Sequence, residues 1–418
     1  MTSIRAQDQT TTDHAGSDRT KLDGNYWRLW WANAINSVGD GAFIAALPLL
    51  AVTVTKDPQQ ISLIATATYL PWLLFSLPAG VIVDRYDRAT LMWRWQAFQA
   101  AVVTAVAVAV LTSHTTIVLL IIASFLLGGA QVIITNAAQS ALPQFVPASL
   151  LHKANGNQYV AQTLGTSTLG PPLGSLLFVA AAALPFGLNA ASFVVSAVLL
   201  AALPRQYGPA GQRRSMRAEM LEGMRWLKGH KVLRTLALML GMNTFCHQMG
   251  FATLVLLATE TLHLGTRAYG LILIGGGLGS IIGGLVNARI AERLGTLPAL
   301  VVSYAANAAI YIGIGLAPNG GVLAGLLTVS GLVVTVTGVV TVSMRQQIVP
   351  GHLLGRVNSV YRMLGWGLMP FGSLLGGYVA HQFGLRAPFI GAGAIRVLVL
   401  AAAAPALIAG VRSLNEKL

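Results

Sequence analysis

Three polar residues of the first apolar segment could hold a proton and a ligand side by side. Asp40 lies about ten residues inside the stretch 29–54, which is about 15 Å along a helix that rises 1.5 Å per residue. A charge at that depth of a membrane costs at least about 2.5 kcal/mol, so such a carboxylate is expected to be functional. Burial favours its neutral form, and Asp40 is therefore predicted to load and release protons. Asn33 and Asn36 share its helix face by their i, i+3, i+7 spacing.

The second half of the chain offers a weaker counterpart to Asp40. A shift of 203 residues leads to Asn243, and His247 follows one turn later. His247 is a candidate for proton coupling, although a hydrogen-bonded interior histidine explains it equally well. A structural role for Asp40, neutralised by an arginine such as Arg94 or Arg396, stays open.

Other kinds of chemistry are poorly represented in the sequence. The single cysteine excludes an intrachain disulfide and a cysteine metal cluster. Neither a Walker-type Gly-x4-Gly-Lys-Ser/Thr loop nor an HExxH or GxSxG motif occurs, which argues against direct ATP use and against an enzyme. We therefore expect no catalytic residue, no metal and no cofactor.

The elements that position these residues must lie in lipid. The chain has 418 residues, of which 55% are hydrophobic and only 10% are charged, where a soluble protein has about a quarter charged. Apolar runs of about 20 residues, the length that spans a bilayer, recur along it. The net charge of +14 is scattered over short segments between these runs, so we expect no nucleic-acid binding.

Twelve membrane spans are predicted from helix length and turn signals. They are 29–54, 61–83, 91–112, 116–139, 155–180, 185–203, 233–259, 268–288, 297–317, 320–344, 357–381 and 386–411. If the N-terminus is cytoplasmic, 23 of the 27 Lys and Arg residues fall on the cytoplasmic side. The positive-inside rule therefore predicts that both termini are cytoplasmic.

These spans divide the chain into five parts. Residues 1–26 form a polar cytoplasmic tail expected to be disordered, and 27–204 and 233–412 form two six-helix bundles. Residues 205–232 are a cytoplasmic linker, and 413–418 a cytoplasmic C-terminus. The linker contains an amphipathic helix that would lie on the membrane surface. Its apolar side carries Met216, Met220, Met224 and Leu227.

The two halves repeat in sequence. The segment that starts Val146-Pro147 is echoed 203 residues later at Val349-Pro350, and Pro172-Leu-Gly-Ser-Leu recurs from Pro370 as Pro-Phe-Gly-Ser-Leu. A parallel repeat of this kind is how many transporters build a midplane site between two rocking bundles.

The loop after the second span resembles the major facilitator signature Gly-x-Leu-Ala-Asp-Arg-x-Gly-Arg-Arg. It matches at Gly80, Asp84, Arg85 and Arg88, and departs at Asp87, where glycine is usual. In that superfamily the loop is thought to latch the cytoplasmic side. Asp84 could cap a neighbouring helix and pair with an arginine, which would favour one closed arrangement. Charges that only set the topology are the alternative.

The fifth span is similar to the antiporter signature of drug-exporting members, with serine at position 175 in place of the last glycine. Its glycines and prolines would bend the helix and let another helix pack close, either for packing alone or to shape the gate between the halves. They are Gly165, Gly170, Pro171, Pro172 and Gly174.

Over residues 27–412 the pattern looks most like the branch that holds macrolide-efflux and enterobactin-exporter proteins. This resemblance implies an all-α membrane protein with twelve helices in two pseudo-symmetric bundles, the major facilitator fold. It also implies that the first, fourth, seventh and tenth spans surround a substrate cavity. The polar residues predicted to line it are Asn33, Asn36, Gln131, Thr135, Gln139, Asn243, Thr337 and Thr341.

The leading hypothesis is a proton-coupled efflux transporter of amphipathic small molecules, such as drugs or natural products, that works by alternating access. Its partners would be the substrate, protons and the lipid bilayer of a bacterial inner membrane, and a monomer is expected. A siderophore or metabolite exporter is the alternative, followed by an importer or facilitator. A membrane protein without transport activity is the hypothesis from a different class.

Overall fold

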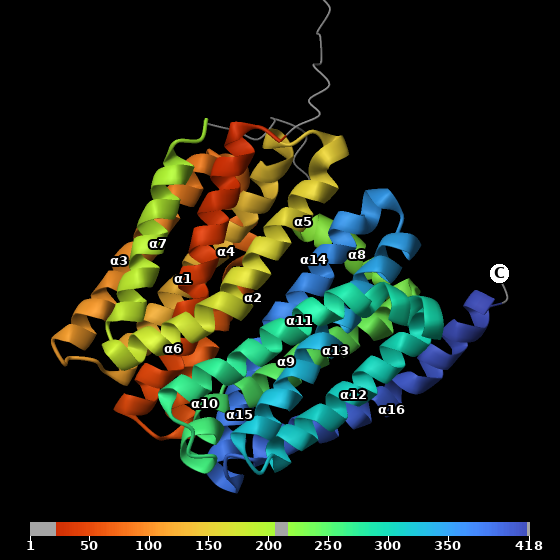
Figure 1. Ribbon diagram of the computed structural model, residues 1–418. Helices are drawn as coiled ribbons and strands as arrows, with labels where there is room; N and C mark the ends of the chain where they lie inside the picture. The colour runs from red at the N-terminus through yellow and green to blue at the C-terminus, as the bar shows by residue number, and fades with distance from the viewer. Residues whose placement is uncertain (1–21, 205–215, 416–418) are drawn as a thin grey trace, which may run out of the picture.

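The structure, a computed structural model, describes residues 22–204 and 216–415, which form helices joined by short turns (Figure 1). The first group of helices consists of α1 (Gly24–Val54), α2 (Pro58–Arg85), α3 (Arg88–Leu111), α4 (Ile117–Phe145), η1 (Ala148–Leu150), α5 (Leu151–Gln162), η2 (Thr163–Leu169), α6 (Gly170–Ala180) and α7 (Leu184–Ala201). The second group consists of α8 (Met216–Gly229), α9 (Lys231–Phe251), α10 (Leu254–Leu256), η3 (Leu257–Thr261), α11 (Thr266–Leu294), α12 (Thr296–Leu316), α13 (Gly320–Ile348), α14 (Gly351–Gly367), α15 (Met369–Phe383) and α16 (Ala387–Asn415).

Several helices begin at a polar residue that caps their first turn. The first N–H groups of a helix lack partners within it, and a side-chain oxygen one position before the helix can accept from them. Asp23 does this for α1, Asp57 for α2, Asp87 for α3 and Thr116 for α4. The short polar segments before these four helices thus decide where they start.

The chain is a membrane protein with multiple spans. Eight of the described helices are long and apolar enough to cross a bilayer, namely α1, α3, α4, α7, α11, α12, α13 and α16. The other four predicted spans fall on α2 and on three stretches, α5–η2–α6, α9–α10–η3 and α14–α15, each interrupted by a change of helix type or a break. The count of twelve stays a prediction.

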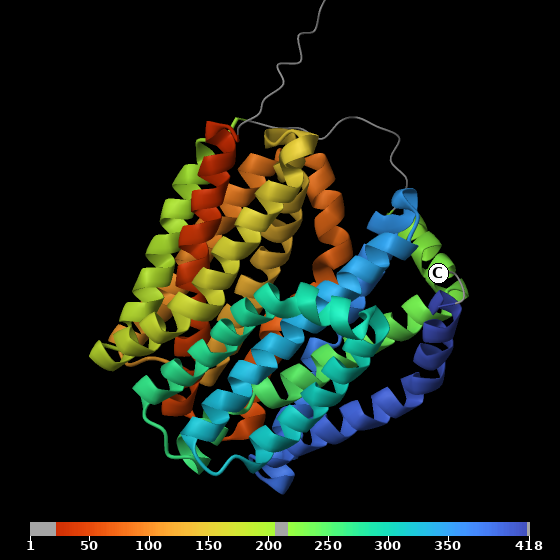
Figure 2. The same cartoon turned by 45° about the vertical axis from the view of Figure 1, so that its right-hand side comes forward.

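The two groups of helices lie side by side and touch firmly at one end (Figures 1 and 2). Lys56 and Glu260 form an ion pair of 2.9 Å across the groups, and His381 Nδ1 lies 3.2 Å from Asp57 Oδ1. At the other end, where α1 begins and α7 ends, the ribbons of the two groups diverge in both views. We call the first end the closed end and the second the open end.

The α8 helix lies within the predicted linker and packs on α14. Its Glu222 accepts a hydrogen bond from Arg356, and Met224 and Leu227 pack against the core of the second group. The side chains of Met216 and Met220 lie outside the described part of the structure. The apolar side of α8 is thus used, at least at these two residues, to contact protein.

The stretch α5–η2–α6 approaches α1 very closely. Its middle part, η2, is π-helical, a form that is frequent at functional sites. A Cβ atom added to Gly170 would lie 2.5 Å from Cα of Gly41, and one added to Gly174 would lie 2.6 Å from Cα of Ala42. Gly165 faces Ser37 in the same way. The glycines of the antiporter-like motif therefore serve as a packing surface for α1.

On its other side the same stretch contacts the second group. Gly270 of α11 lies against Ser175 and Pro171, and Gly277 lies against Ser167. The stretch is thus held between α1 and α11, at the closed end of the molecule.

We predict that Gly174→Ala destabilises the protein by about 1–3 kcal/mol, because the new methyl group meets the backbone of α1 and cannot be accommodated without a shift. Gly338→Ala is the matched control, since nothing lies within 4 Å of its added Cβ atom and alanine favours a helix. The apparent melting temperature in detergent should fall for the first variant only. Equal melting temperatures would show that the close packing is unimportant.

Candidate functional site

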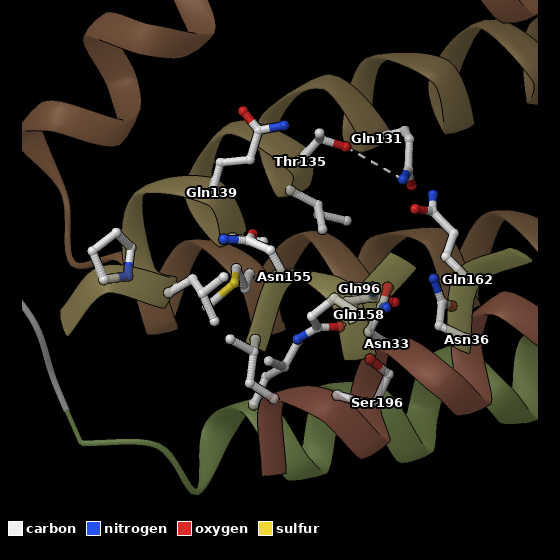
Figure 3. A pocket seen from close by; sticks show the side chains of 18 of the residues that line it. Asn33, Asn36, Gln96, Gln131, Thr135, Gln139, Asn155, Gln158, Gln162 and Ser196 are labelled. Atoms are coloured by element: carbon white, nitrogen blue, oxygen red, sulfur yellow. Dashed lines mark hydrogen bonds between the residues drawn. The ribbon is translucent and has the colours of Figure 1, made fainter. Parts of the chain in front are cut away.

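A cavity of about 440 Å³ lies within the first group of helices (Figure 3). Its lining comes from α1, α3, α4, α5 and α7, at the end of the group that is open. One side is apolar, with residues such as Leu29, Met92 and Leu142. The polar lining residues are Asn33, Asn36, Gln96, Gln131, Thr135, Gln139, Asn155, Gln158, Gln162 and Ser196.

Two rows of amide side chains face each other across α1 and α5. Asn33 Nδ2 donates to Gln158 Oε1 at 2.7 Å. Asn155, Gln158 and Gln162 repeat on α5 the i, i+3, i+7 spacing of α1, so they lie on one face of the helix. Figure 3 shows Gln158 close to Asn33, and Asn155 and Gln162 among the other polar residues of the cavity. This spacing was visible in the sequence and could have indicated them.

The contributions of α3, α5 and α7 were not predicted, because only four spans were expected around the cavity. Gln96 on α3 lies three residues before Gln99, and Ser196 on α7 follows Asn189 and Ser192 at i, i+3, i+7, so both helices have a polar face in the sequence. Their place in the cavity depends on how the helices pack.

The α4 helix contributes the three residues that were predicted from it. Gln131 Nε2 donates to Thr135 Oγ1 at 3.4 Å and its Oε1 accepts from Gln99 at 3.3 Å. Gln139 accepts a 2.6 Å bond from Arg362 of α14. The last bond crosses between the two groups of helices, so the cavity wall is tied to the second group there.

Asp40 lies at the inner end of this polar surface. Asn36, whose side chain lines the cavity, donates through Nδ2 to Asp40 Oδ2 at 3.1 Å. Neither of the arginines considered as partners neutralises it: the Arg94 guanidinium lies 5.6 Å from the ring centroid of Trp93, and Arg396 bonds elsewhere. Among the described residues, the bond from Asn36 is the one that reaches this carboxylate.

Four of the helical segments that contact α1 carry no ionisable residue. The sequences of α4, η2, α6 and α7 contain no Asp, Glu, Lys, Arg, His, Tyr or Cys. The charged residues of α3 are Arg88 and Arg94, and Arg88 donates to the carbonyl of Ser140. Asp40 is half-buried, and among the described residues no charged side chain pairs with it.

The predicted residues of the second group are brought together around a buried arginine. Arg396 is 4% exposed, and its Nε donates to Asn243 Oδ1 at 2.9 Å. Its guanidinium lies 3.7 Å from the ring centroid of Tyr311, whose hydroxyl is 2.6 Å from His247 Nδ1. His247 and Tyr311 border a second cavity, of about 390 Å³, between the two groups. Asn243 thus holds a cation and lines neither cavity.

The threonines predicted on α13 are placed differently from the α4 residues. Thr337 donates to the carbonyl of Val333 and Thr341 to that of Thr337, and both are buried. Neither lines either of these two cavities. Their role in substrate binding stays a prediction.

The loop that resembles the major facilitator signature, called here the gate motif (Gly80, Asp84, Arg85 and Arg88), contains a helix cap at the position where it departs from that signature. Asp87, buried in the turn, accepts a 2.7 Å bond from the backbone N–H of Thr90 and so caps α3. Gly80 lies in α2, Arg85 is exposed at its end, and the side chain of Asp84 lies outside the described part of the structure. Asp87 thus caps α3, and the roles expected of Asp84 stay predictions.

The sequence profile of the transmembrane secretion effector family matches residues 22–416, and the chain belongs to this family of major facilitator transporters. It is similar to the multidrug efflux pump Tap of Mycobacterium tuberculosis, with 26% identity over 387 residues that cover 89% of this chain and 91% of the relative. The pump of the same name from Mycolicibacterium fortuitum is 26% identical over 84% of this chain and 88% of its own. The chain is a transporter and not an enzyme.

Solved structures share the fold. The nucleoside transporter NupG superposes with a TM-score of 0.73 at 11% identity, covering 92% of this chain and 99% of its own. A bacterial homologue of the human lysosomal transporter Spinster, in its inward-facing and unoccupied conformation, gives 0.68 at 14% identity, with 92% and 96% covered. The all-helical major facilitator fold is thereby established.

We predict that Asp87→Ala lowers stability by about 0.5–2 kcal/mol, because the first turn of α3 loses its cap. Asp87→Asn should cost little, since asparagine caps as well as aspartate. Thermal melting of the purified variants checks this. A loss of the same size in both variants would mean that the charge of Asp87, and not its cap, stabilises the loop.

Proposed function

We propose that this protein exports small molecules from the cytoplasm in exchange for protons. The observation that carries the proposal is the bond between Asn36, in the wall of the cavity, and Asp40, the acid of the helix core. The relatives named multidrug efflux pumps support the direction of transport. On this proposal the protein resides in a bacterial inner membrane as a monomer, with twelve spans and both termini cytoplasmic.

The proposed organisation follows the sequence boundaries. Residues 27–204 and 233–412 form two six-helix halves, and 205–232 joins them along the cytoplasmic surface. Residues 1–26 and 413–418 are cytoplasmic ends. The contacts of α1–α7 among themselves, and of α9–α16 among themselves, support this division.

Asp40 would carry the proton. In its charged form it accepts from Asn36, so the amide N–H is directed away from a ligand. Protonation of Asp40 removes the charge that holds this N–H and changes the hydrogen bonds that Asn36 offers to the cavity. Two ligands that alter one another's binding must do so reciprocally, so a bound substrate also changes the proton affinity of Asp40.

Alternating access would move the two halves about the closed end. The open end bears the cavity and most of the Lys and Arg residues, and the positive-inside rule supports a cytoplasmic position for it. Opening the opposite side requires the Lys56–Glu260 pair to break and α11 to leave α6. The gate motif and the glycine stretch of the fifth span would set the two end states.

We predict that Asp40→Asn abolishes proton-driven transport while leaving ligand exchange in place. Inverted vesicles would be energised, and uptake of ethidium, tetraphenylphosphonium, uridine and 4-nitrophenyl β-glucoside measured. Uptake of whichever probe is transported should fall at least about ten-fold, because the carrier of the proton is lost. Exchange of the same probe without a proton gradient should persist.

The matched control is Glu260→Gln, which removes an acid at the exposed rim and should keep proton-driven uptake. Equal uptake by the wild type and Asp40→Asn would make Asp40 structural. Movement of the probe in the same direction as the protons, and not in the opposite direction, would favour an importer.

We predict that the cavity is reached from the cytoplasm. A cysteine placed at Asn155 in a Cys246→Ser background should react with an impermeant maleimide in inverted vesicles and react poorly in right-side-out vesicles. Lys56→Cys, at the exposed rim of the closed end, should show the opposite preference. The reverse pattern would invert the proposed topology.

A further inference from the structure

The first cavity is built almost entirely from one kind of polar group. Eight of its lining residues carry a side-chain carboxamide, distributed over α1, α3, α4 and α5. Each carboxamide offers two N–H donors and an acceptor oxygen, and carries no charge. A wall of this composition can match hydroxyl, carbonyl and amide groups of a ligand in either sense of the hydrogen bond.

Part of this hydrogen-bonding capacity is unused. Asn36 Oδ1 and Gln96 Oε1 are buried and accept no hydrogen bond, and the two residues are 7% and 3% exposed. A buried polar atom without a partner costs about 1–3 kcal/mol. A ligand that donates hydrogen bonds to these oxygens would recover that cost, which gives the site a physical reason to bind polar groups.

The lining lacks the groups that recognise organic cations. No Asp, Glu, Lys or Arg and no aromatic residue occurs among the described residues that line it. A cation would therefore find neither a carboxylate at the wall nor a ring for a cation–π contact. The second cavity differs in this respect, because Tyr69, Phe251 and Tyr311 line it.

Two charged residues contact the wall from outside the lining. Asp40 accepts from Asn36, and Arg362 donates to Gln139 from the second group. They are of opposite sign, neither is a lining residue, and each is hydrogen-bonded to an amide of the wall.

We propose that the first cavity binds an uncharged ligand rich in hydroxyl, carbonyl or amide groups, with one apolar side, and discriminates against organic cations. Its apolar face, with Leu29, Met92 and Leu142, would take the less polar side of the ligand. That this ligand is the exported cargo rests on the function proposed above.

Binding to the purified protein in lipid nanodiscs tests the proposal. The neutral probes are 4-nitrophenyl β-glucoside and uridine, and the cationic probes are tetraphenylphosphonium and ethidium. Equilibrium dialysis should show that at least one neutral probe binds ten-fold or more tightly than either cation. Gln96→Leu and Gln131→Leu should each weaken that neutral probe by about two- to ten-fold, the effect of one lost hydrogen bond.

A negative charge introduced into the wall of the first cavity should change its preference between neutral and cationic ligands. Gln131→Glu keeps the shape of the side chain and adds a carboxylate, so binding of tetraphenylphosphonium should tighten several-fold. Asn319→Asp is the matched control, because it makes the same chemical change at the cap of α13, where aspartate serves equally well. The control should bind all four probes as the wild type does.

Several outcomes would overturn the proposal. One is a cation that binds the wild type as tightly as the neutral probes, and another is that neither neutral probe binds. A third is neutral binding that both leucine variants leave unchanged while their melting temperatures show them folded. Neutral binding without proton-linked uptake would sink the exporter and keep this ligand class. Asp40-dependent uptake of ethidium, unaffected by the leucine variants, would sink this ligand class and keep the exporter.

Discussion

A charged carboxylate at the depth of a membrane is costly, and in the first group of helices that constraint falls on Asp40. Asp40 lies half-buried on α1, and α4, η2, α6 and α7, which contact α1, contain no ionisable residue. Its hydrogen bond comes from the amide of Asn36, which costs no second buried charge. The partner that solvates the acid is also part of the cavity wall. Proton and ligand are thereby connected through one side chain.

The glycines of the fifth helical stretch make this arrangement possible. Because Gly165, Gly170 and Gly174 have no side chain, α1 can lie against the backbone of η2 and α6 on either side of Asp40. The other face of the stretch meets α11 through Gly270 and Gly277. A small displacement of this stretch would therefore be felt both at Asp40 and at the contact between the two groups. A packing role and a gating role for the motif are consequently two aspects of one geometry.

The sequence allowed the helices, the family and the face of α1 to be predicted, because each rests on local spacing or on a continuous motif. It did not allow all the residues that line the first cavity to be predicted. Gln96 and Ser196 reach the cavity from helices that were expected to lie outside it. Asn243 was expected beside the substrate, and its bond to Arg396 depends on the packing of α9 against α16. This bond joins residues 153 positions apart and leaves no local signal.

The sequence repeat relates the positions of Asp40 and Asn243 in the two groups of helices. A displacement of 203 residues, which relates Val146-Pro147 to Val349-Pro350, carries Asp40 onto Asn243. At one of these positions an acid is held by the amide of Asn36, and at the other an amide holds the buried Arg396. Each of the two positions thus takes part in a hydrogen bond between an amide and a charged side chain, and the two charges have opposite sign. A neutral amide bears the hydrogen bond in both, which limits the cost of burying each charge. The bond between Asp40 and the amide of Asn36 is therefore a property of the helix arrangement. The surrounding residues, amides in one half and aromatic rings in the other, make the two cavities different.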